Sequence, residues 1–163
     1  MRERRTIDDL LLEARSRIRR YTPAEAAAAV AAGAVVIDTR SDIDVQTEGR
    51  IPGSVYFHRN VLEWRCDPAA SHSDQRVNDV RQRLIIVCND GCSSSLAAAS
   101  LVALGFAEAG DLIGGYRSWV AAGLPVDREC VEPNVAVCHN RQQTVSWRER
   151  FSKFAQAIQI QKS

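Results

Sequence analysis

The sequence lacks an excess of charge of either sign and lacks a long apolar run. Its 163 residues hold 21 Lys and Arg against 20 Asp and Glu, a net charge of +1, so the basic footprint of a dedicated nucleic-acid binder is missing. The alanine-rich segment 26–37 is far shorter than the roughly 20 apolar residues that span a bilayer. The Leu10–Leu12 run is closed at once by Glu13 and Arg15, which leaves no signal-peptide core. We expect neither nucleic acid nor a membrane as a partner.

Cysteine is sparse and irregularly placed. The five cysteines stand at 66, 88, 92, 130 and 138, without the dense spacing of a disulfide scaffold, which favours a reducing cytoplasm. Apolar residues make up 45% and charged residues 25%, as in ordinary globular proteins. At roughly 150 residues per domain, the length predicts one domain with an additional segment.

Capping signals predict two helices near the N-terminus. Thr6 and Asp9 form a capping box ahead of apolar residues at helical spacing, which predicts a helix over about 7–20. Thr22, Pro23 and Glu25 repeat the signal before an alanine run that ends at Gly33, so a second helix is expected over about 23–32.

Short runs rich in β-branched residues predict strands buried on both faces. Such runs cover 34–37, followed by Asp38, and 84–87, followed by Cys88. The second leads through a tight loop into a helix expected over about 94–104, and a further strand near 111–113 precedes Gly114 and a helix carrying Tyr116 and Trp119. This alternation is typical of an α/β fold, whose chemistry lies in the loops beyond the carboxyl ends of its strands. Those loops begin here at Asp38 and Cys88.

The residues after Pro125 differ in composition from the rest. Both lysines and five glutamines lie there, and Ser146 with Glu149 can cap a last helix. Its apolar residues recur by four, three and four positions and form one stripe: Trp147, Phe151, Phe154 and Ile158. We expect this stripe to be covered by the domain or by a second copy of the chain.

Cys88 stands where a thiolate is favoured. It ends a predicted buried strand and precedes a helix N-terminus, which contributes about half a positive charge. Unsatisfied backbone N–H groups there can stabilise a thiolate, a persulfide or a bound oxyanion. The alternative is that Cys88 is a small buried residue that merely completes the strand.

Five segments, in this order and spacing, resemble the rhodanese family. They are Ile37-Asp38-Thr39-Arg40, Gly49-Arg50-Ile51-Pro52-Gly53-Ser54, Cys88-Asn89-Asp90-Gly91-Cys92-Ser93-Ser94, Gly114-Gly115-Tyr116-Arg117-Ser118-Trp119 and Ala122-Gly123-Leu124-Pro125-Val126. The resemblance implies a three-layer α/β fold with a central parallel five-stranded sheet flanked by helices. It divides the chain into an N-terminal helix (1–21), a rhodanese-like domain (22–127) and a C-terminal extension with an amphipathic helix (128–163).

The resemblance also implies the chemistry. Cys88 matches the cysteine that carries sulfane sulfur as a persulfide, and residues 89–93 match the rest of the six-residue active loop. Ser93 stands where many members have Arg, and Arg50 where many have His. Arg40, Arg59 and Arg65 are candidates to supply the positively charged anion contact that Ser93 cannot make.

The implied function is that of a single-domain sulfurtransferase. It takes sulfur from a small anionic donor such as thiosulfate and passes it to cyanide or a thiol, without a cofactor, and a homodimer through the terminal helices is possible in this scheme. The opposing hypothesis is a rhodanese-like binding or regulatory module with weak turnover. A cysteine phosphatase is disfavoured because position 94 is Ser, where that chemistry needs an arginine fork.

Other interpretations of these residues stay open. Cys92 either resolves an oxidised Cys88 into a disulfide or is a variable loop residue. Asp38 and Arg40 fit a structural ion pair better than a catalytic role. A zinc site is disfavoured, although its possible ligands have permitted spacings: Cys88, Cys92, Cys130, Cys138 and His139.

Overall fold

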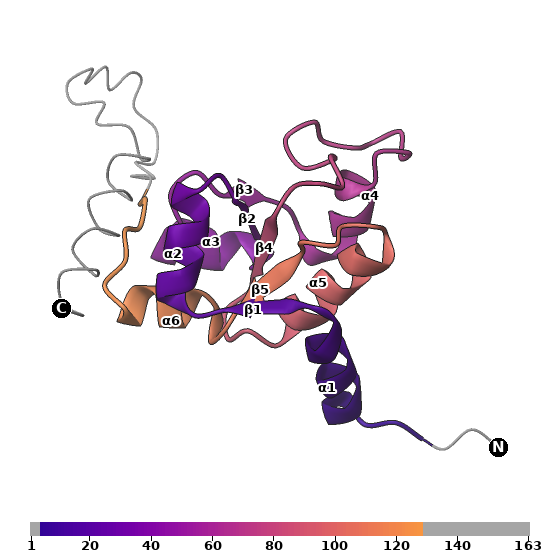
Figure 1. The fold of residues 1–163 in the computed structure, drawn as a ribbon. Coiled ribbons are helices and arrows are strands. Elements are labelled where there is room, and N and C mark those ends of the chain that lie inside the picture. Colours follow the sequence, from indigo (N-terminus) through magenta and orange to yellow (C-terminus); the bar gives the residue numbers. More distant parts are fainter. Residues whose placement is uncertain (1–3, 129–163) are drawn as a thin grey trace.

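The computed structural model describes residues 4–128, which build a five-stranded, all-parallel sheet in the order β1-β5-β4-β2-β3 (Figure 1). This arrangement confirms the expected parallel five-stranded α/β fold. In chain order the elements are α1 (Ile7–Arg17), β1 (Arg19–Tyr21), α2 (Pro23–Ala31), β2 (Val35–Asp38), α3 (Asp42–Glu48), β3 (Val55–Tyr56), the 3₁₀ turn η1 (Arg59–Val61), α4 (Leu62–Cys66), β4 (Leu84–Val87), α5 (Ser93–Ala103), β5 (Gly110–Leu112) and α6 (Gly115–Ala121).

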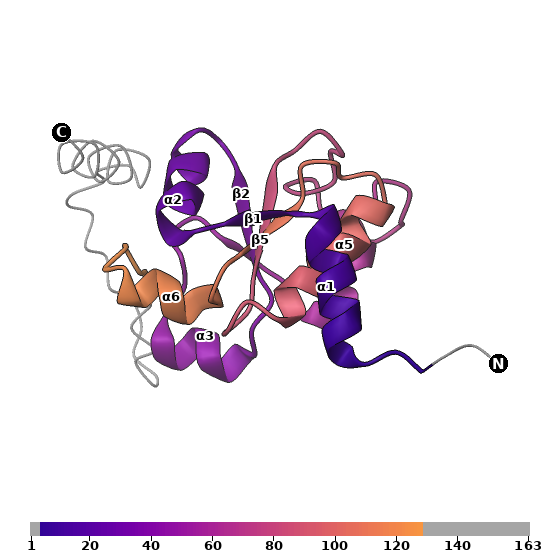
Figure 2. The same ribbon diagram turned by 60° about the horizontal axis from the view of Figure 1, so that its bottom comes forward.

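Helices cover both faces of the sheet and give three layers. One face carries α2 and α6, with α3 beside them, and the other carries α4 and α5, with α1 packed against α5 (Figures 1 and 2). The core is accordingly divided in two. Trp119 of α6 lies in the first half and Leu101 of α5 in the second, both fully buried.

The central strand β4 is buried on both faces, as its sequence predicts. Ile85 and Val87 pack in one half of the core, and Leu84 and Ile86 pack in the other. Successive side chains of a strand point to opposite faces of the sheet, so a strand buried on both faces needs an apolar residue at every position. This explains why apolar and polar residues do not alternate in β4.

The first helix is shorter than predicted. Its capping box at Thr6 is present, but α1 ends at Arg17 rather than near residue 20. Residues 19–21 instead form the edge strand β1, which pairs with β5 and buries Tyr21. Pairing across the sheet supplies the hydrogen bonds that further helical turns would have made, and the local pattern holds no information about that distant partner.

The other predicted elements lie within a residue or two of their expected places. The short elements α3, β3, η1 and α4 were not predicted. Residues 67–82 follow α4 and form turns and irregular loop. The predicted helix at 146–158 lies outside the described residues.

Candidate active site

The candidate site lies at the carboxyl end of the central strand. β2 and β4 are neighbours in parallel register, so the loops that follow Asp38 and Val87 meet at one edge of the sheet. Thr39 ties them together, since its backbone N–H and its hydroxyl both donate to Val87 O, at 2.8 and 2.9 Å. Between the loops lies an open cavity of about 360 Å³ lined by Thr39, Arg40, Ser41, Cys88, Asn89, Asp90, Cys92 and Ser93.

Cys88 is buried at the base of this cavity, with 7% of its surface exposed. Gly91 N–H donates to Cys88 Sγ at 3.2 Å, and the thiol donates to Ser94 Oγ at 3.2 Å. Once the thiol ionises, the Ser94 hydroxyl can donate in the opposite sense. Of the expected loop residues, Gly91 and Ser94 therefore contact the sulfur of Cys88.

The surroundings of Cys88 favour its thiolate. Burial acts to raise its pKa, but hydrogen bonds from the Ser93 and Ser94 hydroxyls and from the Ser94 and Asp90 backbone outweigh burial and lower the pKa below the ordinary thiol value. Cys66 shows the opposite case, because burial without such donors raises its pKa to about 12. The pKa values of these two buried cysteines therefore shift in opposite directions, because the loop supplies hydrogen-bond donors to Cys88.

The start of α5 is open to an anion. Its N-cap residue, Cys92, makes no side-chain hydrogen bond to the first turn. The first N–H groups of this helix of 11 residues therefore point toward the loop without a side-chain cap.

Two glycines allow the loop to close tightly. Gly91 has φ +73°, and a Cβ there would stand 2.7 Å from Leu112 O. Gly115 has φ +59°, and a Cβ there would stand 2.5 Å from Asn89 O. The close approach at Gly115, the first residue of α6, lets Tyr116 N–H donate to Cys88 O at 2.8 Å, and this bond holds the backbone of the cysteine.

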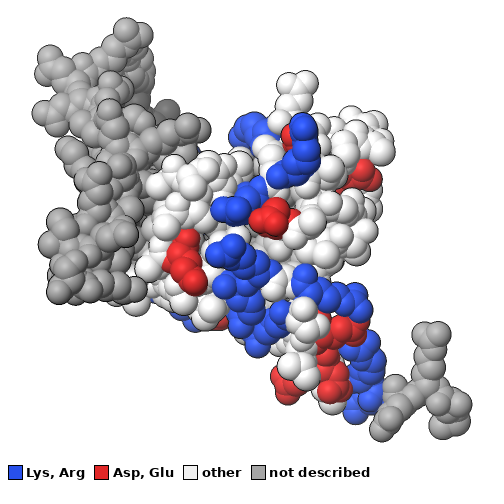
Figure 3. All heavy atoms as spheres, in the orientation of Figure 1, with Lys and Arg blue, Asp and Glu red and all other residues white. Residues whose placement is uncertain are grey.

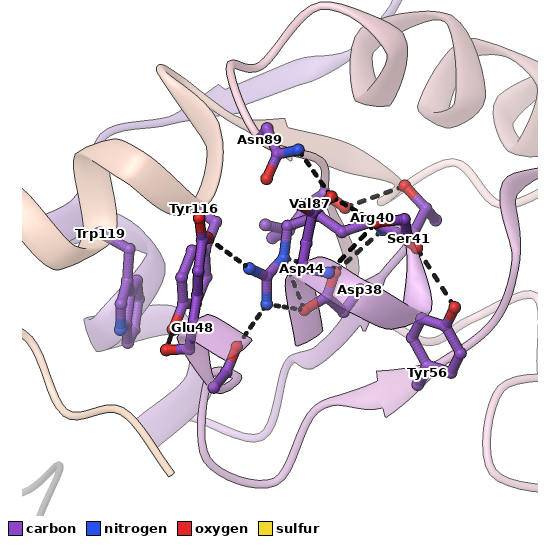
Figure 4. Close-up of polar contacts among 12 residues, drawn as sticks. Asp38, Arg40, Ser41, Asp44, Glu48, Tyr56, Val87, Asn89, Tyr116 and Trp119 are labelled. Carbon is purple, nitrogen blue, oxygen red and sulfur yellow. Dashed lines mark hydrogen bonds and ion pairs between the residues drawn. The ribbon is translucent and has the colours of Figure 1, made fainter. Parts of the chain in front are cut away.

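Arg40 is buried and lines the cavity, and Figure 4 shows its polar contacts. Its guanidinium pairs with Asp38 at 2.8 Å, donates to Gly49 O at 2.6 Å and lies 3.5 Å from the ring centroid of Tyr116. Glu48 accepts a further bond at 3.2 Å. The side chain is 0% exposed, so its donors are committed to the protein, which favours the structural interpretation of Asp38 and Arg40.

The other two candidate arginines point elsewhere. Arg59 pairs with Glu63 one helical turn away at 2.9 Å, and Arg65 donates to the backbone oxygen of His72 at 3.2 Å. Neither lines the cavity. The structure thus brings Arg40 beside Cys88 but not Arg59 or Arg65.

Several residues that support the loop were missed from the sequence. Asn89 donates to Asp44 of α3 at 3.0 Å, and Asp90 pairs with Arg117 of α6 at 2.6 Å. Behind the loop, Arg15 of α1 and Arg20 of β1 both donate to Gly91 O, at 3.2 and 3.4 Å. The sequence carries no signal for these contacts, because they join elements that come together only in the tertiary fold.

Metal and membrane sites were also sought. Within residues 4–128, no group of three or more His, Cys, Asp or Glu side chains is placed to hold a metal ion. Cys130, Cys138 and His139 lie outside that range. None of the helices in the described part of the chain is long and apolar enough to cross a bilayer.

The fold and the site define a parallel α/β protein with a buried cysteine in the loop that follows its central strand. The model of the rhodanese-like domain family matches residues 22–122, and the chain belongs to this family. Helix α1 precedes the matched range.

Known relatives agree with this assignment. The thiosulfate sulfurtransferase GlpE of Pseudomonas fluorescens is 35% identical over 105 residues, which cover 64% of this chain and 86% of that protein. A Rhodopseudomonas palustris protein of unknown function, named a possible tyrosine phosphatase, is 29% identical with a TM-score of 0.71 and covers 78% of this chain and 98% of its own. A rhodanese-related protein of Thermoplasma volcanium shares the fold, with 22% identity, a TM-score of 0.56 and coverage of 68% and 99%.

Proposed function

We propose that this protein is a single-domain sulfurtransferase in which Cys88 carries sulfane sulfur as a persulfide. One observation carries the proposal: Cys88 Sγ is buried beneath a cavity and held at 3.2 Å by both Gly91 N–H and Ser94 Oγ. These donors stabilise a negative sulfur without a cofactor, whether it is the thiolate or the terminal sulfur of a persulfide. The sulfurtransferase relatives support the same reaction.

The reaction has two displacement steps. The Cys88 thiolate attacks the outer sulfur of thiosulfate, the S–S bond of the donor breaks, and sulfite leaves with the bonding electron pair. The acceptor, cyanide or a thiolate, then attacks the outer sulfur of the Cys88 persulfide. Thiocyanate or a new persulfide leaves, and the Cys88 thiolate is restored. Each step conserves charge and needs no external oxidant or reductant.

Loop amides and the α5 N-terminus receive the anionic donor in this proposal. Gly91, Cys92 and Ser94 supply the backbone N–H groups of the loop, and Ser93 supplies a hydroxyl at the cavity wall. Asn89 and Asp90 shape the rim through their bonds to Asp44 and Arg117.

The opposing function is a rhodanese-like binding or regulatory module, which the serine at position 93 favours because the loop itself contains no cation. Mass spectrometry after incubation with thiosulfate or polysulfide separates the two. The enzyme gains an adduct of about 32 Da, one sulfur atom, which cyanide removes. Cys88→Ser should lose the adduct and Cys92→Ser should keep it. Absence of an adduct with every donor refutes the sulfurtransferase.

A phosphatase is a second candidate because of the name of the Rhodopseudomonas palustris relative. Position 94, where a phosphatase loop needs an arginine fork, is a fully buried serine bonded to Cys88. Hydrolysis of an aryl phosphate that Cys88→Ser abolishes would favour this candidate over sulfur transfer.

The cytoplasmic location and the homodimer predicted from the sequence are part of this proposal. Reduced cysteines fit a reducing compartment, and Cys66, Cys88 and Cys92 are all free thiols. Leu12 and Ile7 of α1 are 74% and 58% exposed, which supports a contact between copies through the terminal helices.

A further inference from the structure

The active loop is held from behind by two arginines that precede the family-matched range. Arg15 Nη2 and Arg20 Nη2 both donate to the backbone oxygen of Gly91, at 3.2 and 3.4 Å. Neither arginine lines the cavity, and Arg15 Nη2 also lies 4.0 Å from Cys92 Sγ. Arginine side chains gather over α1 and the adjoining β1 edge of the molecule (Figure 3).

A partly buried hydrogen-bond network holds both guanidinium groups. Arg15 Nε donates to Ser95 Oγ at 3.3 Å, and Ser95 Oγ donates to Asp111 Oδ2 at 2.6 Å. Arg20 Nε donates to Asp111 Oδ1 at 2.9 Å, and the Asp111 side chain is 0% exposed. These hydrogen bonds connect α1, α5, β5 and β1 in turn. The arginines at the two ends of the network both donate to Gly91 O.

This contact sets the direction of the next peptide N–H. The peptide between Gly91 and Cys92 is trans, as are the peptide bonds throughout residues 4–128. A trans peptide is planar, so its N–H points opposite to its C=O. Because both arginines hold the Gly91 oxygen behind the loop, the Cys92 N–H is turned away from them, toward the side where the cavity lies. Gly91 N–H already faces Cys88 Sγ at 3.2 Å.

We propose that Arg15 is a positioning residue of the sulfurtransferase site, through which α1 orients the Gly91–Cys92 peptide and places a positive charge behind the sulfur of Cys88. This inference rests on the proposed function. It also gives a reason why the loop can carry Ser93 where many rhodaneses have arginine: the cation approaches from behind, on a helix outside the family-matched range.

Two arginines near the loop are paired with carboxylates: Arg117 bonds Asp90 at the rim, and Arg40 bonds Asp38. The Asp44 carboxylate accepts a hydrogen bond from the neutral amide of Asn89. Arg20 is neutralised by Asp111, with two bonds between them. Arg15 makes no ion pair with a carboxylate within the described residues. Its positive charge at the loop is therefore offset less by a neighbouring negative charge than that of Arg20.

The test compares Arg15→Met with Arg17→Met. Both remove one positive charge from α1, but Arg17 pairs with Glu13 on the surface and does not contact the loop. In a Cys92→Ser background, trypsin releases peptide 84–117 with Cys88 as its single cysteine, so its alkylation by iodoacetamide can be followed against pH. We expect Arg15→Met to raise the alkylation midpoint by about half a pH unit and the thiosulfate KM by about 3- to 10-fold. Arg17→Met should change neither.

A charge-conserving variant, Arg15→Lys, keeps the test informative if Arg15→Met does not fold. Arg15→Lys keeps the charge, but one ammonium group cannot reproduce the forked contact with both Gly91 O and Ser95 Oγ. We expect it to restore the alkylation midpoint while the thiosulfate KM stays at least 2-fold raised. An Arg15→Met protein that is folded and matches Arg17→Met in both measurements overturns the proposal, and so does Arg15→Lys with a wild-type KM.

The alkylation profile also separates this inference from the proposed function. It needs no sulfur donor, so a raised midpoint in a protein without sulfurtransferase activity supports the positioning role and refutes only the reaction. An active enzyme with an unchanged midpoint and KM in Arg15→Met refutes only the positioning role.

Discussion

Replacing Arg40 with methionine removes one member of a fully buried ion pair. The guanidinium and the Asp38 carboxylate are 0% and 1% exposed and lie 2.8 Å apart. Methionine preserves much of the side-chain volume but leaves the carboxylate without its partner and Gly49 O without its donor. We expect the free energy of unfolding to fall by about 3–5 kcal/mol, the usual cost of an uncompensated buried charge. That is a large part of the 5–15 kcal/mol typical of a domain.

Urea unfolding followed by tryptophan fluorescence measures this loss, since Trp119 is fully buried in the core. The matched control is Arg81→Met, because Arg81 is 87% exposed and pairs with Asp79 at the surface. This change should cost less than about 1 kcal/mol. Adding Asp38→Asn to Arg40→Met should recover part of the lost stability, since no buried charge is then left alone.

The refuting result is equally specific. An Arg40→Met protein that loses less than about 1 kcal/mol and shows a raised thiosulfate KM would mean that Arg40 binds the donor anion instead of holding the fold. The structural interpretation of Asp38 and Arg40 would then be wrong.

Four further outcomes are expected. Ser93→Arg should lower the thiosulfate KM, because a forked cation at the start of α5 would contact an anionic donor; unchanged kinetics in a folded variant would contradict this. The alkylation rate of Cys88 in the wild-type protein should persist below the ordinary thiol pKa of about 8.5 and decline only at lower pH, because loop hydrogen bonds lower the pKa. Under peroxide, a Cys88–Cys92 disulfide in peptide maps would establish the resolving role of Cys92, whereas sulfinic acid on Cys88 would exclude it. Truncation after Val131 should lower the melting temperature or change the sedimenting mass while persulfide formation persists; no change in either would show the predicted C-terminal helix to be wrong.

Local patterns in the sequence were sufficient for most of the sheet and its flanking helices. The all-apolar run 84–87 predicted a strand buried on both faces, and the capping boxes at Thr6 and Thr22 predicted helix starts; the structure has all three. The same is true of the position of Cys88 between a buried strand and a helix. These features depend on neighbours a few residues apart, so the chain itself contains the information.

The tertiary structure decided which distant groups meet. Residues 19–21 became an edge strand because β5, about ninety residues later, offered hydrogen bonds that a local pattern cannot reveal. Arg59 and Arg65 found partners away from the cavity, and Arg15 reached the active loop across a separation of 76 residues. A long arginine side chain can approach any acceptor within its reach, so its partner is fixed only when packing brings two elements together. The sequence therefore determined the cysteine and its loop, and the packing of α1 against α5 determined the charges that act on them.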